Sequence, residues 1–203
     1  MSGPTPDEIT RHHEWTPPAD AEIFVDGGPH PEPVEIVAYD HAWPAEYALV
    51  AERIHHVLGT HVIGLDHIGS TAVPGLPAKP VIDIDLTVTD SSDETAYVPA
   101  LQSAGFRLVI RESGWHEHRL LTLDDPRVNL HVFSPGCPEV VRHRMFRDWL
   151  TSHPGDRALY CDAKLEAAAG VRATGASVMV YNQRKQPVIR DIYARMFRAH
   201  GLL

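Results

Sequence analysis

Two aspartates in one short apolar segment are the residues whose types and spacing most directly suggest chemistry. Asp83 and Asp85 alternate with Ile82, Ile84 and Leu86. Because successive side chains of a strand point to opposite faces, both carboxylates share one face, with Cα atoms roughly 7 Å apart. Like charges at this separation repel each other unless a cation lies between them. The pattern therefore predicts a site for a hard divalent cation with oxygen ligands, such as Mg²⁺.

The loop that precedes these aspartates has residues suited to phosphate binding. Gly69, Ser70 and Thr71 follow a strand-like run at 62–65. Gly69 lets the backbone pass close to a ligand, and Ser70 and Thr71 could donate hydroxyl and amide hydrogens to phosphate oxygens. The alternative is an ordinary turn in which Ser70 is a cap. Lys79, later in the loop, is either a cation that closes over the site or a solvated loop lysine.

The same stretch resembles a known family. A Gly-Ser turn followed after about a dozen residues by Asp-x-Asp resembles the DNA polymerase β-type nucleotidyltransferase superfamily. The sequence from His67 to Pro80 is similar to that of the GrpB (UPF0157) family, a branch of that superfamily sometimes fused to dephospho-CoA kinase. The resemblance covers about residues 34 to 198 and includes Tyr39-Asp-His-Ala-Trp-Pro44, Asn129-Leu-His-Val132, Phe146-Arg-Asp-Trp-Leu150, His153-Pro154, Tyr160 to Lys164 and Tyr181 to Lys185.

The superfamily usually has a third carboxylate on a later strand, and this chain departs from that pattern. We take His131 as the equivalent residue, because it shares a strand face with Asn129. An imidazole there is either a softer metal ligand, which favours Mn²⁺ or another transition metal, or a general base. Glu117 is the other candidate, with His116 and His118 on the opposite face if that stretch is a strand.

The resemblance also implies a role for two lysines near the C-terminus. Lys164 and Lys185 match family lysines and would reach a triphosphate from the far side of a cleft. The alternative is that both are solvated, as lysines on amphipathic helices usually are. Arg147 is expected to form an ion pair with Asp148 rather than to hold substrate.

Periodicity and the resemblance together predict an α+β fold, a nucleotidyltransferase-like mixed β-sheet with flanking helices and a C-terminal helical half. Residues 1–33 read as a flexible N-terminal extension in which 23–25 could add an edge strand. Residues 34–135 form the sheet core, and 136–203 a helical region packed on it. Strands are expected at 34–38, 62–65, 81–88, 106–110, 119–123 and 127–133. Helices are expected at 44–58, 138–153, 156–170 and 175–200, and another is expected to follow a turn at 90–93 and to end at Gly105.

Composition narrows the class of protein. The 203 residues are 43% hydrophobic, enough for a globular core, and carry a formal net charge of -9. An acidic balance argues against extended nucleic-acid partners. No apolar run approaches the roughly 20 residues that span a bilayer, and no signal peptide is visible. Cys137 and Cys161 are expected to be reduced thiols in a cytoplasmic protein.

The leading hypothesis is a nucleotidyltransferase that depends on Mg²⁺ or Mn²⁺ and moves an NMP group from an NTP to a small-molecule acceptor. One alternative is a nucleotide-binding or regulatory module with impaired catalysis, which the missing third carboxylate favours. Another is a different metal-dependent chemistry, such as phosphate-ester hydrolysis, at Asp83, Asp85 and His131.

Overall fold

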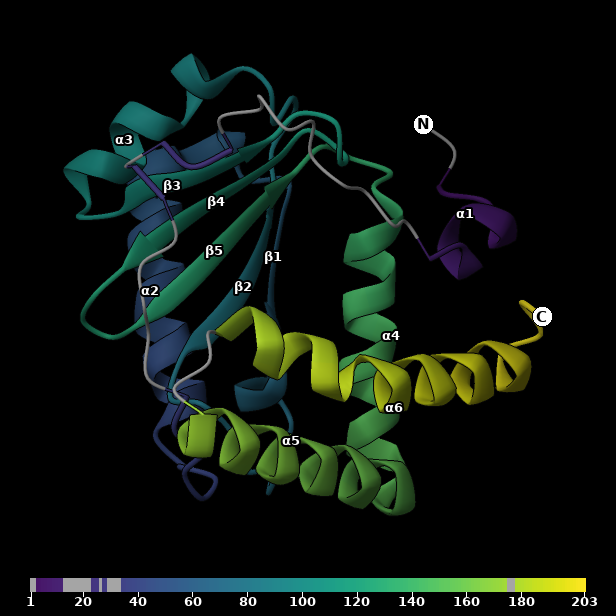
Figure 1. The fold of residues 1–203 in the computed structure, drawn as a ribbon. Helices are drawn as coiled ribbons and strands as arrows, with labels where there is room; N and C mark the ends of the chain where they lie inside the picture. Colours follow the sequence, from purple (N-terminus) through teal and green to yellow (C-terminus); the bar gives the residue numbers. More distant parts are fainter. Residues whose placement is uncertain (1–2, 13–22, 26, 29–33, 175–177) are drawn as a thin grey trace.

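The fold is organised around one mixed sheet of five strands in the order β1-β2-β5-β4-β3 (Figure 1). The structure is a computed structural model that describes residues 3–12, 23–25, 27–28, 34–174 and 178–203. Strands β2 and β5 are parallel, and the other neighbouring pairs are antiparallel. The strands are β1 (Gly64–Ile68), β2 (Ile82–Thr87), β3 (Arg107–Glu112), β4 (His118–Leu123) and β5 (Val128–Phe133).

One face of the sheet forms the main apolar core. The alternation in β2 turns Ile82, Ile84 and Leu86 to this face, where all three are buried. The helices α2 (Trp43–Leu58) and α3 (Val98–Ser103) pack on the same cluster. The two aspartates of β2 are thereby directed to the other face of the sheet.

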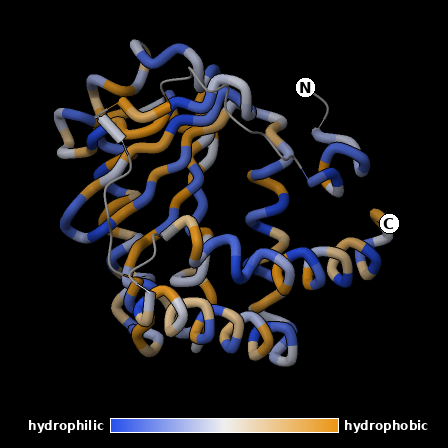
Figure 2. The backbone as a smooth tube through the Cα atoms, in the orientation of Figure 1, coloured by the Kyte–Doolittle hydropathy of each residue, from blue (hydrophilic) through white to orange (hydrophobic). Residues whose placement is uncertain are grey.

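Three C-terminal helices cover that other, polar face (Figure 1). They are α4 (Pro138–Ser152), α5 (Pro154–Thr174) and α6 (Val178–Ala199). Figure 2 shows hydrophilic and hydrophobic residues alternating along the central strands and along these helices. The apolar side chains of the helices form clusters separate from the main core, centred on residues such as Leu150, Ile192 and Met196. Polar side chains are therefore left facing each other between the sheet and the helices.

The predicted α+β architecture is confirmed, including the mixed sheet and the helical C-terminal half. The structure also leaves Cys137 and Cys161 as free thiols, as expected. The start predicted for the last helix, at residue 175, lies outside the described residues. None of the helices in the described part of the chain is long and apolar enough to cross a membrane.

Three predicted elements are corrected. Residues 34–38 contribute one bridge, between Val37 and Ala78, and no strand. The helix predicted between the turn at 90–93 and Gly105 is a 3-10 turn followed by the short α3, because Pro99 lacks an N–H and suits the first turn of a helix. His116 and Glu117 have φ of 55° and 49°, so the stretch before β4 is a turn and not a strand.

Part of the predicted flexible extension packs on the C-terminal helices. A short helix, α1 (Pro6–Thr10), begins at a capping box made by Thr5 and Glu8. Its Ile9 is buried against apolar residues of α6. Phe24 makes a bridge with Ile110 at the edge of the sheet, as expected for 23–25. Most of the remaining extension lies outside the described residues.

Candidate active site

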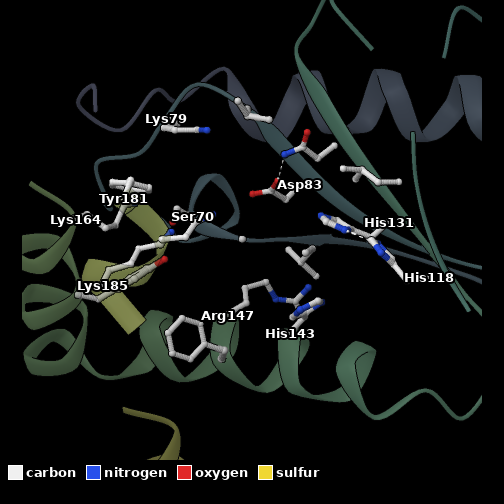
Figure 3. A pocket seen from close by; sticks show the side chains of 18 of the residues that line it. Ser70, Lys79, Asp83, His118, His131, His143, Arg147, Lys164, Tyr181 and Lys185 are labelled. Atoms are coloured by element: carbon white, nitrogen blue, oxygen red, sulfur yellow. Dashed lines mark hydrogen bonds between the residues drawn. The ribbon is translucent and has the colours of Figure 1, made fainter. Parts of the chain in front are cut away.

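A cavity of about 580 Å³ lies between the polar face of the sheet and the helices α4, α5 and α6. The parallel register of β2 and β5 pairs Asp83 with Asn129 and Asp85 with His131. Side chains from all five strands of the sheet and from three helices thus meet around one space (Figure 3). Of the acidic residues in the described chain, Asp83 and Glu112 line it.

Asp83 is fixed at the centre of the cavity by two neighbours. The amide of Asn129 donates a hydrogen bond of 2.9 Å from Nδ2 to Asp83 Oδ1. On the other side, Gly69 lies so close that a Cβ at this position would be 2.9 Å from the Cβ of Asp83. Burial raises the pKa of Asp83, and the bond from Asn129 opposes that rise. The result is a partly buried carboxylate with one oxygen left for a ligand.

Asp85 does not line the cavity. It is 1% exposed, and its Oδ2 lies 2.9 Å from Nδ1 of His143 on α4. Burial acts to lower the pKa of His143, but the neighbouring Asp85 carboxylate outweighs it and raises that pKa. The other oxygen of Asp85, Oδ1, is buried without a hydrogen-bond partner. His143 therefore separates Asp85 from the space that Asp83 faces, while leaving one carboxylate oxygen unsatisfied.

All three lysines of the chain, Lys79, Lys164 and Lys185, line this cavity. They come from three separate segments, namely the loop before β2, α5 and α6. Figure 3 shows the lysines at one end with Ser70, and His118 and His131 at the other, with Asp83 between them. Such a concentration of ammonium groups in a chain of net charge -9 indicates an anionic ligand, for which phosphate is the natural candidate.

Lys164 is the most enclosed of the three. It is 1% exposed, and its Nζ donates a hydrogen bond of 2.6 Å to the carbonyl oxygen of Pro77. Burial, with Lys185 nearby, lowers the pKa of Lys164 to about 7. Its ammonium group thus anchors the loop that carries Lys79, and an entering anion would favour its charged form.

We expect Lys164 to titrate near pH 7 and to make wild-type stability depend on pH. An unfolded lysine keeps its proton up to its ordinary pKa of 10.5. Between about pH 7 and 10 the unfolded state therefore binds more protons, so the free energy of unfolding rises with pH. Urea titrations should show this rise in the wild type and a smaller one in Lys164→Met.

NMR of ¹³C-labelled lysine offers a direct reading, because the chain has three lysine signals and Lys164→Met identifies one of them. Added ATP should move the Lys164 titration to higher pH, since a phosphate favours the ammonium form. A Lys164 signal that keeps the ordinary pKa of a lysine would contradict its burial.

Arg147 joins the lysines in the cavity wall. Its Nη1 donates a hydrogen bond of 2.9 Å to the carbonyl oxygen of His67. Its Nε lies 2.7 Å from Oδ1 of Asp148, which is the predicted ion pair. His67 Nε2 is 3.0 Å from Thr71 Oγ1, which donates in turn to the carbonyl of Val81. Thr71 is thereby occupied within the loop and does not line the cavity.

The other end of the cavity holds a chain of hydrogen bonds. His131 Nδ1 is 3.0 Å from His118 Nε2, and His118 Nδ1 is 2.7 Å from Glu112 Oε2. Burial lowers the pKa of His131 well below its ordinary value, and His118 and His143 add to the effect. His131 is therefore neutral near pH 7 and presents a ring nitrogen to the cavity.

One observation supports a role of the two aspartates in binding a cation. Asp83 Oδ2 and Asp85 Oδ1 receive no hydrogen bond from the residues that the structure describes. Within those residues, no group of three or more His, Cys, Asp or Glu side chains is arranged to hold a metal ion. The predicted set of Asp83, Asp85 and His131 is therefore not assembled. A metal in the cavity would bind Asp83 and take its other ligands from substrate and water, and Asp85 would reach it only by leaving or sharing His143.

The structure thus brings together most of the predicted site residues. Those that line the cavity are Gly69, Ser70, Lys79, Asp83, His131, Lys164 and Lys185. Glu117 belongs to the turn before β4, where it contacts Arg119, so its candidacy is withdrawn. Glu112 and His143 were not predicted. The chain has only three lysines, and this restriction was a signal in the sequence that could have pointed to the site. The pairing of His143 with Asp85 could not be found in this way, because it depends on how α4 packs.

Comparisons with known proteins identify the family. The GrpB protein family matches residues 33–195. A UPF0157 protein of Halalkalibacterium halodurans is 43% identical over 167 residues, 82% of this chain and 84% of that protein. A dephospho-CoA kinase of Mycolicibacterium paratuberculosis is 32% identical over 189 residues, 80% of this chain but 46% of that protein. The crystal structure of the conserved protein GrpB from Enterococcus faecalis has the same fold, with a TM-score of 0.71 and 24% identity, covering 82% of this chain and 99% of that one. The chain belongs to the GrpB (UPF0157) family.

Proposed function

We propose that the protein is a nucleotidyltransferase that moves an NMP group from an NTP to a hydroxyl or amine of a small molecule, with Mg²⁺ or Mn²⁺ as cofactor. The observation that carries the proposal is the gathering of all three lysines around the cavity that Asp83 faces. Four positive side chains, counting Arg147, suit the charge of a triphosphate. A cavity of about 580 Å³ suits a small acceptor better than a polymer.

The chain's own residues have separate roles in this proposal. Lys79, Lys164 and Lys185 bind phosphate oxygens and hold the leaving pyrophosphate, and Ser70 donates to the same group. A divalent cation on Asp83 and Asp85 would supply neutralisation of charge on the phosphates. Catalysis then depends mainly on positioning, because transfer of the NMP group needs little covalent chemistry from the protein.

The relatives suggest which ligands to try. Part of the proteins named dephospho-CoA kinase is similar to this chain. That likeness supports including ATP as donor and dephospho-CoA as acceptor among the compounds tested. We further propose a cytoplasmic setting, where NTPs are abundant and the free thiols of Cys137 and Cys161 stay reduced.

A second candidate function is a nucleotide-binding module that does not turn over its ligand. The burial of Asp85 under His143 favours it, because that carboxylate would have to leave His143 or share with it in order to meet a metal bound to Asp83. The two functions predict the same nucleotide binding but differ in product formation.

A panel of four NTPs with Mg²⁺ or Mn²⁺ separates the two. Pyrophosphate release that depends on an acceptor, with a product heavier by one NMP in mass spectrometry, supports the transferase. NTP binding at micromolar concentration without product supports the module. Absence of NTP binding in calorimetry at millimolar concentration would refute both.

We expect Lys185→Ala to weaken nucleotide use more than it changes folding. Lys185 Nζ lies 4.5 Å from the centre of the Tyr181 ring and is half-buried at the lysine end of the cavity. Loss of one charge-assisted contact to phosphate should raise the nucleotide KM by about 10-fold, a change of about 1.4 kcal/mol.

Arg198→Ala is the matched control, because Arg198 is an exposed cation on the same helix and is not among the residues that line the cavity. Steady-state kinetics and thermal melts of both variants give the comparison. Equal KM values for Lys185→Ala and Arg198→Ala would remove Lys185 from the nucleotide site.

A further inference from the structure

A continuous chain of hydrogen bonds runs from Glu112 through His118 to His131 at the end of the cavity away from the lysines (Figure 3). His118 is 3% exposed, and both of its ring nitrogens are used in this chain. The ring of His118 lies nearly parallel to those of His131 and Phe133, at interplanar angles of 23° and 27°, with centroids 5.2 Å and 4.9 Å away. Its orientation is therefore set by packing as well as by hydrogen bonds.

The order of donors along the chain follows from what each group can do. A carboxylate only accepts hydrogen bonds, so Glu112 takes the proton-bearing Nδ1 of His118 as its donor. A neutral His118 then has a lone pair at Nε2, which accepts from Nδ1–H of His131. A neutral His131 with its proton on Nδ1 has no proton on Nε2. That atom makes no hydrogen bond with any described residue, and His131 lines the cavity.

We propose that Glu112 and His118 are positioning residues that hold His131 in the tautomer with an unprotonated Nε2, so that His131 accepts the proton of the acceptor hydroxyl or amine. This inference rests on the proposed transferase function and adds to it the place where the acceptor is activated. It assigns the acceptor to the histidine end of the cavity, beside Ile110, Trp115 and Leu120, and the triphosphate to the lysine end.

The proton has a defined route in this arrangement. As the acceptor oxygen or nitrogen forms its bond to the α-phosphorus, the bond from that phosphorus to pyrophosphate breaks and pyrophosphate leaves with the electron pair. The acceptor proton moves to His131 Nε2, and the Nδ1 proton of His131 moves to His118 Nε2. His118 then carries the positive charge beside the Glu112 carboxylate.

The neighbours of the two histidines favour that final location of the charge. His131 is partly buried, its ring centroid lies 6.3 Å from that of His143, and Asp85 occupies the paired position on the adjoining strand. Asp85 is already paired with His143. His118, in contrast, has Glu112 at 2.7 Å as its own counter-charge. Glu112 thus gives proton movement along these hydrogen bonds a direction, from the cavity to the edge of the sheet.

The tautomer can be measured without any assay of activity. In protein labelled with ¹⁵N-histidine, His131→Asn identifies the His131 signals among those of the 14 histidines. Two-bond ¹H–¹⁵N spectra near pH 7 should show His131 with its proton on Nδ1 and none on Nε2. A proton on Nε2 of His131 would overturn the proposal, whether or not the protein transfers nucleotides.

Kinetics then test the role of Glu112. Glu112→Gln keeps the shape but removes the counter-charge, and we expect kcat to fall by roughly 10²-fold, the lower end of what a positioned base contributes, with little change in nucleotide KM. The pH dependence of kcat should change with it. Glu117→Gln is the control, since Glu117 is five residues along the chain, half exposed, and contacts Arg119 outside the cavity.

The outcomes separate the two levels of the proposal. An active wild type whose kcat and pH profile are equally unaffected by Glu112→Gln and Glu117→Gln would refute the positioning role while leaving the transferase intact. An inactive wild type with the expected tautomer would instead count against the transferase, and the histidine arrangement would stand.

Discussion

Asp83→Asn is expected to abolish metal-dependent transfer while leaving the fold intact. Asparagine keeps the shape of the side chain and an oxygen that can accept the hydrogen bond from Asn129 Nδ2. It removes the negative charge that faces the three lysines and would hold a cation. Loss of such an electrostatic contact at a phosphoryl centre lowers kcat by about 10²- to 10³-fold or more.

The same substitution should not lower stability, and at neutral pH it should raise it. Burial raises the pKa of Asp83 above its ordinary value of 3.8. A carboxyl group of this kind favours the folded state fully below its unfolded pKa and loses that contribution as pH rises through the folded pKa. The introduced asparagine cannot ionise, so the ligand-free variant should have an equal or higher melting temperature at pH 7, and the difference should vanish near pH 3.

Asp162→Asn provides the control, because Asp162 is exposed on α5 and is not part of the cavity wall. Activity is followed by pyrophosphate release, and stability by thermal melts at pH 3 to 8. Full activity in Asp83→Asn would remove this aspartate from the site. Lost activity together with a lower melting temperature would mean that Asp83 supports the fold instead.

Local alternation explains which part of the site could be predicted from the sequence. Asp83 and Asp85 were expected to share a face because a strand has a period of two, and the same reasoning put Asn129 beside His131. The structure agrees on both strands. A period places residues on a face, however, and says nothing of which element covers them. That is why both aspartates were expected to face the ligand, whereas Asp85 faces His143.

The contacts that were not predicted join residues far apart in the chain. His143 meets Asp85 across 58 positions, and Lys164 meets Pro77 across 87. Helical periodicity predicted the helices at 138–153 and 156–170, but not which strand each helix would cross. Glu112 lies at the end of a strand whose neighbour begins at His118, and the left-handed turn between them has no glycine at the two strained positions. The usual sign of such a turn was therefore missing.

Gly69→Ala is expected to damage both stability and activity. Gly69 has φ of 70°, a conformation that costs an L residue about 1 kcal/mol, and alanine would add a Cβ 2.9 Å from the Cβ of Asp83. The Asp83 Cβ belongs to a central strand and cannot move without its backbone. Overpacking of this kind costs about 1–3 kcal/mol in addition to the strain. Any relief that shifts Asp83 also breaks its bond with Asn129, so kcat should fall with stability.

Gly75→Ala is the control that separates the effect of the close approach between Gly69 and Asp83 from the effect of backbone strain. Gly75 lies in the same loop with φ of 78°, and a Cβ there would meet nothing within 4 Å. Both variants therefore place an alanine at positive φ, with ψ of -167° at Gly69, but only Gly69→Ala presses on Asp83. Urea denaturation should place Gly69→Ala about 1–3 kcal/mol below Gly75→Ala, with near wild-type kcat in the latter. If the two variants were equally stable and equally active, the loop would not be holding Asp83 in place, and the close packing of Gly69 would have no part in the chemistry.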